Sequence, residues 1–133
     1  MNKIIDKLAW IQIQDKKILS TRSRGKSVYY IPGGKREVGE TDQQALSREI
    51  KEELSIELLP ATIDYMGTFK AQADGYPDGT IVKMTCYTAE YEGEIIPNSE
   101  IEEVVWFTYN DKNKSSAVDK LIMDKLMENG LIQ

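Results

Sequence analysis

Three glutamates, Glu49, Glu52 and Glu53, lie close together in a stretch whose apolar residues recur at helical spacing. Residues at i, i+3 and i+4 share one face of a helix, so the three carboxylates are expected to converge, on the side opposite the packing stripe of Leu46, Ile50 and Leu54. Like charges at this spacing destabilise a helix by roughly a few tenths of a kcal/mol per pair. With a divalent cation bound, the same carboxylates form an oxygen ligand set suited to Mg²⁺ or Mn²⁺. The group is therefore either a solvated acidic face or a metal site.

Composition limits the chemistry that is available to the rest of the chain. The 133 residues, 41% hydrophobic and 29% charged, are enough for one folded domain over residues 1–133. The net charge of −5 argues against binding to a nucleic-acid polymer. The chain has no histidine, and Cys86 is its single cysteine, expected to be a buried thiol. Catalysis is therefore expected to use carboxylates, lysines, tyrosines or a metal held by oxygen.

One segment runs against the overall negative charge. Five basic residues and no acid lie between positions 22 and 36: Arg22, Arg24, Lys26, Lys35 and Arg36. This segment is either a solvated loop or a surface that receives a small phosphorylated substrate.

The apolar run at the N-terminus is interrupted by Lys3, Asp6 and Lys7. It matches neither a signal peptide nor a membrane span, so we expect a cytoplasmic protein without membrane contact.

The apolar patterning predicts strands, a helix, strands and a second helix. Thr41 with Gln44 forms a capping box ahead of a helix over 42–54, and Gly130 follows a helix over 115–129. Extended patterns separated by turns predict the strands. They comprise a hairpin within 4–23 that turns at Asp15 and Lys16, a strand at 28–31 stopped by Pro32, a hairpin of 62–73 with 80–93, and a strand at 103–109. This order indicates an α+β fold with helices on the faces of a mixed sheet.

The acidic helix is part of a longer signature with fixed spacing. Gly34 is followed by five residues, Glu40, seven residues, and then the segment Arg48-Glu49-Ile50-Lys51-Glu52-Glu53-Leu54-Ser55-Ile56. This pattern resembles the Nudix box, in which Ser55 stands where the family has glycine. Six fixed residues in register occur by chance roughly 10⁻⁸ to 10⁻⁷ times per starting position. Ser55 should lie at the helix end with φ > 0, at a cost on the order of 1 kcal/mol.

The resemblance implies an α/β/α sandwich around a mixed sheet and hydrolysis of a nucleoside diphosphate derivative with Mg²⁺ or Mn²⁺. It makes Glu49, Glu52 and Glu53 metal ligands, together with the backbone carbonyl of Gly33. Metal ions clamp phosphate oxygens and lower the pKa of bound water.

Two further box residues have supporting roles by the same resemblance. Arg48 would orient a box carboxylate through a charge-assisted hydrogen bond. Glu40 would stand behind the ligands or serve a second metal.

Family members also recruit a glutamate from a later loop, ahead of a strand that carries tryptophan. Here Glu100, Glu102 and Glu103 precede Trp106. Glu100 lies in the loop and is our choice for a fourth ligand or the general base, whereas the other two are equally well explained as solvated acids flanking the strand. A box glutamate is the other candidate for the base.

The box leaves the substrate open. A normal or oxidised (d)NTP is the first interpretation; ADP-ribose or another nucleotide sugar, a dinucleoside polyphosphate, and a non-catalytic nucleotide sensor are the alternatives. Arg22, Arg24, Lys35 and Tyr30 are the candidate substrate-binding residues. Core packing is the competing explanation for each aromatic residue that we considered as a base-stacking partner, namely Tyr29, Tyr30, Trp10, Phe69 and Tyr76. Family members are often homodimers, and nothing in the sequence requires it.

Overall fold

The computed structural model describes residues 3–133. None of the helices in this range is long and apolar enough to span a membrane. In chain order the elements are β1 (Lys3–Trp10), β2 (Ile13–Gln14), β3 (Lys17–Ser23), β4 (Gly33–Lys35), α1 (Asp42–Leu54), β5 (Glu57–Leu58), the 3-10 helix η1 (Pro60–Thr62), β6 (Asp64–Gln72), β7 (Thr80–Thr88), β8 (Tyr91–Glu92), β9 (Ile101–Phe107), the 3-10 helix η2 (Tyr109–Lys114) and α2 (Ala117–Glu128).

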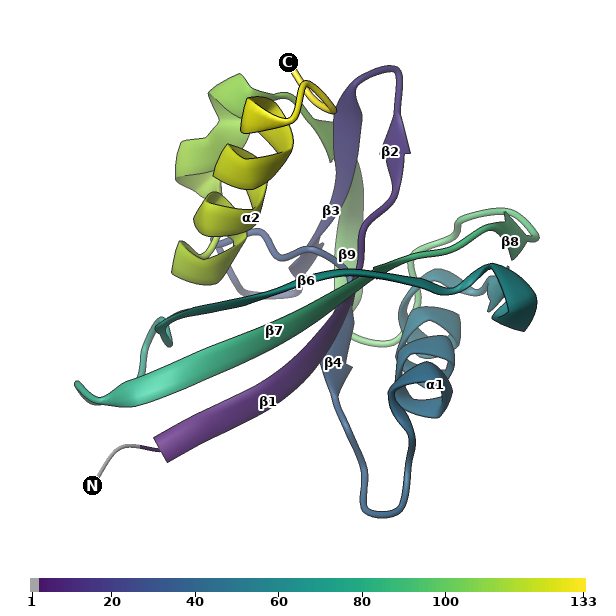
Figure 1. Cartoon of the computed structure of the whole chain (residues 1–133), viewed down its shortest axis with the longest axis horizontal. Helices are drawn as coiled ribbons and strands as arrows, with labels where there is room; N and C mark the ends of the chain where they lie inside the picture. The colour runs from purple at the N-terminus through teal and green to yellow at the C-terminus, as the bar shows by residue number, and fades with distance from the viewer. Residues whose placement is uncertain (1–2) are drawn as a thin grey trace.

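The strands form a mixed arrangement between two helices. The largest sheet has the order β4-β1-β7-β6, in which β1 runs parallel to β7 and antiparallel to β4. A second sheet has the order β2-β3-β9. Helices α1 and α2 lie on opposite sides of these strands (Figure 1). The predicted α+β class with a mixed sheet is confirmed.

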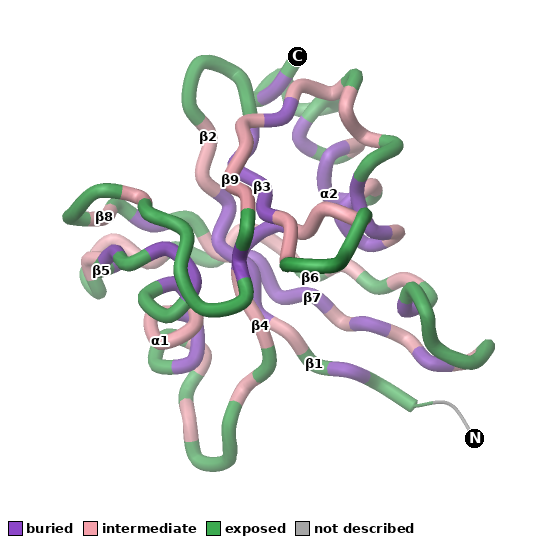
Figure 2. Tube along the Cα trace, turned by 180° about the vertical axis from the view of Figure 1, so that it is seen from behind, coloured by how far each residue is buried: buried purple, intermediate pink, exposed green. Residues whose placement is uncertain are grey.

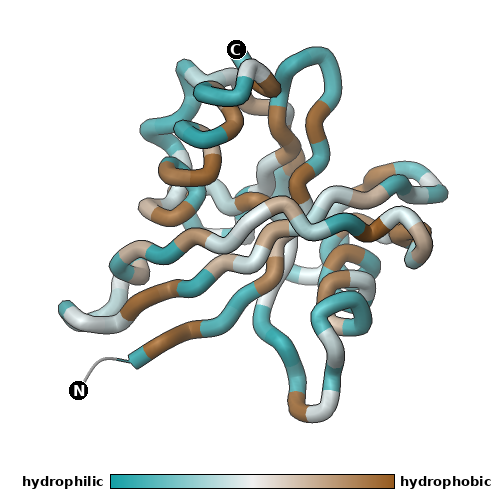
Figure 3. Tube along the Cα trace, in the orientation of Figure 1, coloured by the Kyte–Doolittle hydropathy of each residue, from teal (hydrophilic) through white to brown (hydrophobic). Residues whose placement is uncertain are grey.

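Strand β1 divides the interior into two cores because successive side chains of a strand point to opposite faces. Ile5 and Ala9 belong to the cluster that includes α2, whereas Leu8 and Trp10 belong to the cluster that includes α1. Buried segments occur along β1, β3 and β7 (Figure 2), and hydrophobic and hydrophilic stretches alternate along β1 and β7 (Figure 3).

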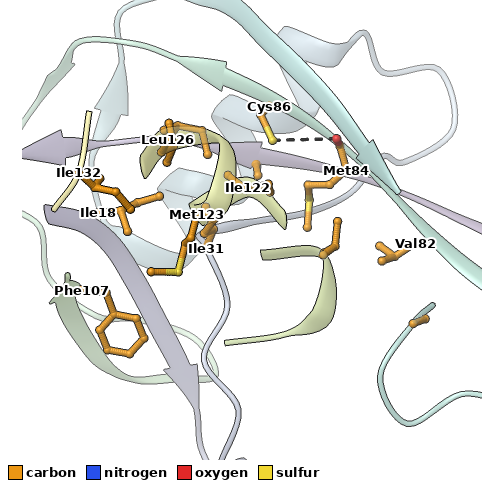
Figure 4. Close-up of a cluster of buried hydrophobic side chains, with 14 of the residues drawn as sticks. Ile18, Ile31, Val82, Met84, Cys86, Phe107, Ile122, Met123, Leu126 and Ile132 are labelled. Carbon is orange, nitrogen blue, oxygen red and sulfur yellow. Dashed lines mark hydrogen bonds between the residues drawn. The ribbon is translucent and has the colours of Figure 1, made fainter. Parts of the chain in front are cut away.

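The cluster on the α2 side shows why the single cysteine is inert. Ile122, Met123 and Leu126 of α2 pack in the same cluster as Ile18 and Cys86 (Figure 4). Cys86 is fully buried, as expected, and burial raises the pKa of its thiol to about 12.

Helix α1 begins and ends as its sequence predicts. The Thr41 hydroxyl accepts a hydrogen bond from the Gln44 amide at 3.2 Å, and the Gln44 side chain accepts one from the Thr41 amide at 2.9 Å. At the other end Ser55 is left-handed, with φ 63° and ψ 26°. A glycine would adopt these angles without steric cost.

The predicted hairpin of β6 with β7 is confirmed, but two other strand predictions need correction. The turn at Asp15 and Lys16 does close a hairpin, but between β2 and β3; most of the preceding run is β1, which joins the other sheet. Tyr29 and Tyr30 form only isolated bridges, and the regular strand comes after Pro32, at Gly33–Lys35. Glycine permits this pairing because its backbone fits closely against β1.

Replacing Ser55 by glycine is expected to stabilise the protein by about 1 kcal/mol, because it relieves the left-handed strain. Urea unfolding of Ser55→Gly beside the wild type measures the gain. Ser55→Ala keeps a side chain at the same φ and is the matched control, expected to show no such gain. Equal stability of all three proteins would contradict the assignment of strain to this residue.

Candidate active site

Glu53 connects α1 to β4 at the centre of the candidate site. The Gly33 amide donates a hydrogen bond to Glu53 Oε1 at 3.0 Å. Glu53 is only 8% exposed, which corrects the expectation that all three acids lie opposite the packing face. Glu53 follows Leu46 by two helical turns and Ile50 by one, so it lies on the buried side of α1.

Gly33 and Gly34 are required by how closely the chain packs here. Gly33 has φ 148°, and a Cβ built on it would lie 1.9 Å from the Leu8 carbonyl oxygen. A Cβ on Gly34 would lie 2.5 Å from the Glu49 carboxylate. The backbone contact at Gly33 therefore excludes a side chain, whereas a side chain at Gly34 would displace the Glu49 carboxylate from its present position.

Arg48 organises the acids around it. Its Nε and Nη2 donate to the two carboxylate oxygens of Glu40, at 2.7 and 2.9 Å. Its Nη1 donates to Glu49 Oε1 at 3.0 Å and lies 3.4 Å from Glu52 Oε2, and its Nη2 reaches the Lys35 carbonyl at 3.1 Å. Arg48 holds the pKa of Glu40 at about 2. Glu40 thus anchors Arg48, and Arg48 in turn positions Glu49.

Glu100 reaches the site because its loop is bound to the end of α1. The last carbonyls of a helix have no partner within the helix. Here the Asn98 amide donates to the Glu53 carbonyl and the Ile96 amide to the Leu54 carbonyl, each at 2.9 Å. Beside Glu100, the Ser99 hydroxyl donates to its Oε2 at 2.6 Å.

Residues of α1, β4 and the Glu100 loop line one cavity of about 400 Å³. Glu49, Glu53 and Glu100 supply its carboxylates, Gly33 and Gly34 one wall, and Tyr30, Lys7 and Lys35 further side chains. Glu52 lies outside it, on the adjoining surface beside Arg48, Ser55 and Asn98, with its side chain 53% exposed. The structure therefore brings together two of the three glutamates of α1 and the loop glutamate Glu100.

Burial makes the carboxylates of Glu49 and Glu53 resist ionisation. Desolvation, with smaller contributions from Glu49 and Glu100, raises the pKa of Glu53 to about 8. Desolvation also raises the pKa of Glu49, although Arg48 opposes it. Acids held in this state gain from a nearby positive charge.

The side chains of Glu49 and Glu53 fit a divalent metal ion, although the acids do not form a closely spaced ligand cluster. Within residues 3–133, no three acidic, cysteine or histidine side chains are close enough to count as a ready metal-binding group. However, Glu49 and Glu53 are poorly solvated oxygen donors on one cavity wall, and Gly34 leaves space at the Glu49 carboxylate. A hard cation with oxygen ligands suits this set.

The basic residues of the 22–36 segment are arranged differently from one another. Lys35 lines the cavity, whereas Arg22 pairs with Glu102 and Glu103 at 3.3 and 3.4 Å. Arg24 contributes its amide to the Glu100 carbonyl at 2.9 Å. These contacts also engage the two acids that competed with Glu100, and leave Glu100 as the one of the three that lines the cavity.

The aromatic candidates divide in the same way. Trp10 is fully buried and donates its Nε1–H to the Ala89 carbonyl at 3.1 Å, so core packing explains it. Phe69 packs against the α2-side core, and Tyr29 contacts Phe107. Tyr30 lines the carboxylate cavity and an adjoining one of about 50 Å³, which Tyr76 also lines.

Lys7 lines both cavities and was not predicted. A signal was present: Lys7 falls between Ile5 and Ala9 at the strand's two-residue period, a charged residue on an otherwise buried face. A lysine at such a position calls for a specific environment.

Without metal, the free energy of unfolding is expected to fall as the pH rises from about 5 to 8. Glu53 has a pKa raised to about 8 in the fold, so the folded state binds more protons than the unfolded chain over this range. A rise in pH therefore favours the unfolded chain, until Glu53 loses its proton in the fold as well. Asp119, whose pKa burial raises to about 7, adds to the same trend. Glu53→Gln should reduce the fall in the free energy of unfolding over this pH range by up to about a few kcal/mol.

Urea unfolding with a chelator present, at several pH values, tests this expectation. Glu94→Gln removes an exposed carboxylate elsewhere and should leave the profile unchanged. Parallel profiles for the wild type and Glu53→Gln would contradict the role assigned to Glu53.

Known proteins resemble this chain over most of its length. A family model described as NUDIX domain matches residues 8–126. An ADP-ribose pyrophosphatase from Methanocaldococcus jannaschii is 30% identical over 104 residues, 76% of this chain and 60% of that protein. The NAD-capped RNA hydrolase NudC of Vibrio vulnificus is 36% identical over 94 residues, 68% of this chain and 33% of that protein. The chain thus spans less than two thirds of either relative.

A solved structure extends the likeness to the whole fold. The solution structure of the E. coli ORF135 protein superposes with a TM-score of 0.75 and 25% identity, covering 96% of this chain and 91% of that one. Together with the family model, which covers most of the residues, this agreement is decisive. The chain belongs to the NUDIX domain family.

Proposed function

We propose that the chain hydrolyses the diphosphate linkage of a nucleoside diphosphate derivative with the help of Mg²⁺ or Mn²⁺. The observation that carries the proposal is the cavity that Glu49, Glu53 and Glu100 line together with Gly33 and Gly34 of β4. A binding module that only senses nucleotides has no need for buried carboxylates with raised pKa values, which cost stability at neutral pH. Hydrolysis gives them a purpose.

The residues divide the chemical task. A bound divalent cation would neutralise phosphate charge and make a water molecule more acidic. Glu49 and Glu53, which line the cavity, would hold that cation together with the Gly33 carbonyl, and Glu52 would join them from the adjoining surface. Arg48 orients Glu49 through its hydrogen bond. Lys35 offers a positive charge to the phosphates.

Glu100 is our candidate to accept the proton of the attacking water. Its side chain is exposed at the cavity, and it stands on a loop held by α1, so it lies within reach of the site while contacting solvent. The Ser99 hydroxyl fixes one carboxylate oxygen. Glu53 is the other candidate, since its raised pKa suits proton transfer near neutral pH.

For the substrate we propose a normal or oxidised (d)NTP. The cavity of about 50 Å³ beside the carboxylates is lined by Tyr30 and Tyr76, which gives one direction for a single nucleoside to extend. ADP-ribose, which carries a second sugar beyond the diphosphate, is the second candidate. It is favoured by the M. jannaschii relative, whose name is ADP-ribose pyrophosphatase.

A substrate panel with product identification tests both candidates. With Mg²⁺, the purified protein is expected to release pyrophosphate and a nucleoside monophosphate from at least one (d)NTP or oxidised (d)NTP. Release of AMP and ribose 5-phosphate from ADP-ribose, without triphosphate turnover, would favour the second candidate. Binding without turnover across the panel would leave a sensor and overturn the proposal.

Substitutions then test the residues. Glu53→Gln should lower kcat/KM on the order of 100-fold or more, because it removes an anionic oxygen from the proposed ligand set. Glu52→Gln and Glu100→Gln should also lower it, whereas Glu94→Gln, an exposed acid that does not line the cavity, should not. Near-wild-type activity of both Glu52→Gln and Glu53→Gln would refute the metal assignment.

A further inference from the structure

Lys7 stands where the two cavities meet. Three residues line both, namely Lys7, Tyr30 and Met84. On one side of them lie the carboxylates Glu49, Glu53 and Glu100. On the other side lie Asp74, Tyr76 and Ser116. Anything that extends from the first cavity to the second must pass this boundary.

The Lys7 ammonium has no carboxylate partner at ion-pair distance among residues 3–133. Its Nζ lies instead 5.7 Å from the centre of the Tyr30 ring. Its charge is still felt on both sides, since it lowers the pKa of Glu53 and of Asp119 against the stronger effect of burial. Lys7 thus keeps its donors available between two acidic groups.

Strand packing explains why the charge can remain at this position. Lys7 shares its strand face with the buried Ile5 and Ala9, and its backbone is paired on both sides, with Lys35 of β4 and Met84 of β7. The backbone is therefore fixed by two neighbours, and the apolar stem of lysine can lie along the sheet while the ammonium reaches the boundary. A residue so held needs little reordering to meet a ligand.

We propose that Lys7 binds a non-bridging oxygen of the substrate phosphate that is attached to the nucleoside. The inference rests on the proposed function and deepens it: the diphosphate lies at the carboxylates, the nucleoside points toward Tyr30 and Tyr76, and the phosphate between them crosses the boundary at Lys7. An ammonium is a compact charge with three donors, suited to a phosphate oxygen. Lys7 is then a substrate-binding residue that the motif does not contain.

Lys7→Met removes the charge and keeps an unbranched side chain. Loss of one charge-assisted hydrogen bond should lower kcat/KM roughly 10- to 100-fold, mainly through KM. Lys7→Arg should recover part of the loss. Lys3→Met removes an exposed lysine from the same strand and should behave as the wild type. Thermal unfolding of each variant establishes that it is folded.

A second measurement separates binding from a general electrostatic effect on the acids. AMP, CMP, GMP and UMP are tested as competitive inhibitors, and the Mg²⁺ concentration for half-maximal activity is measured in parallel. The proposal expects weaker inhibition of Lys7→Met by whichever monophosphates inhibit the wild type, with the Mg²⁺ requirement changed much less. An altered Mg²⁺ requirement with unchanged inhibition would overturn it.

The two proposals fail differently. If the wild type shows no turnover on the panel, the proposed function is wrong before Lys7 is considered. If the wild type turns over a nucleotide and folded Lys7→Met keeps its KM and its inhibition constants, only the inference about Lys7 is wrong.

Discussion

The hydrogen bond from the Gly33 amide to Glu53 is the constraint on which the rest of the site depends. It joins β4 to the buried side of α1 across 20 residues of sequence, and so fixes the distance between this short strand and the acidic helix. A carboxylate in such a place loses most of its solvation, and one backbone donor does not restore it, as the pKa near 8 indicates. The fold therefore holds a carboxylate whose ionised form is unfavourable, and a proton or a bound cation would offset this cost.

Within the described residues, the surrounding contacts leave the Glu53 carboxylate without an arginine partner. Arg48 of the same helix is bound bidentately by Glu40 and shared with Glu49 and Glu52 rather than with Glu53. Amides of the 96–98 segment satisfy the carbonyls of Glu53 and Leu54, which brings a further acid, Glu100, to the cavity. Glu53 and Glu100 are thus brought to one cavity by backbone hydrogen bonds between α1 and the loop, and Glu49 is held by Arg48.

The parts of the site that sequence predicts are those set by local geometry. Helical spacing, the Thr41 cap and the left-handed Ser55 all follow from neighbouring residues, and the structure has each of them. One prediction from the helical spacing was wrong: Glu53 was grouped with Glu49 and Glu52 opposite the packing face. Its spacing from Leu46 and Ile50 also places it at the edge of the buried face, where the structure has it. Pairing across long separations was not predictable, as the contacts of Arg22 with Glu102 and Glu103 in β9 show.

This division also explains why a motif can name a reaction without naming a substrate. The box carboxylates and the glycines of β4 come from one continuous stretch, whereas the second cavity is built from β1, the segment around Asp74 and Tyr76, and the start of α2. Even the wall that holds Tyr30 depends on a distant residue, because the buried Asp119 accepts a hydrogen bond from the adjacent Ile31 amide at 2.8 Å. Each of these segments can change without altering the spacing of the glutamates. With the proposed function, selection among nucleotides would rest on tertiary contacts, and Lys7 lies at the boundary of the two cavities where the local motif meets them.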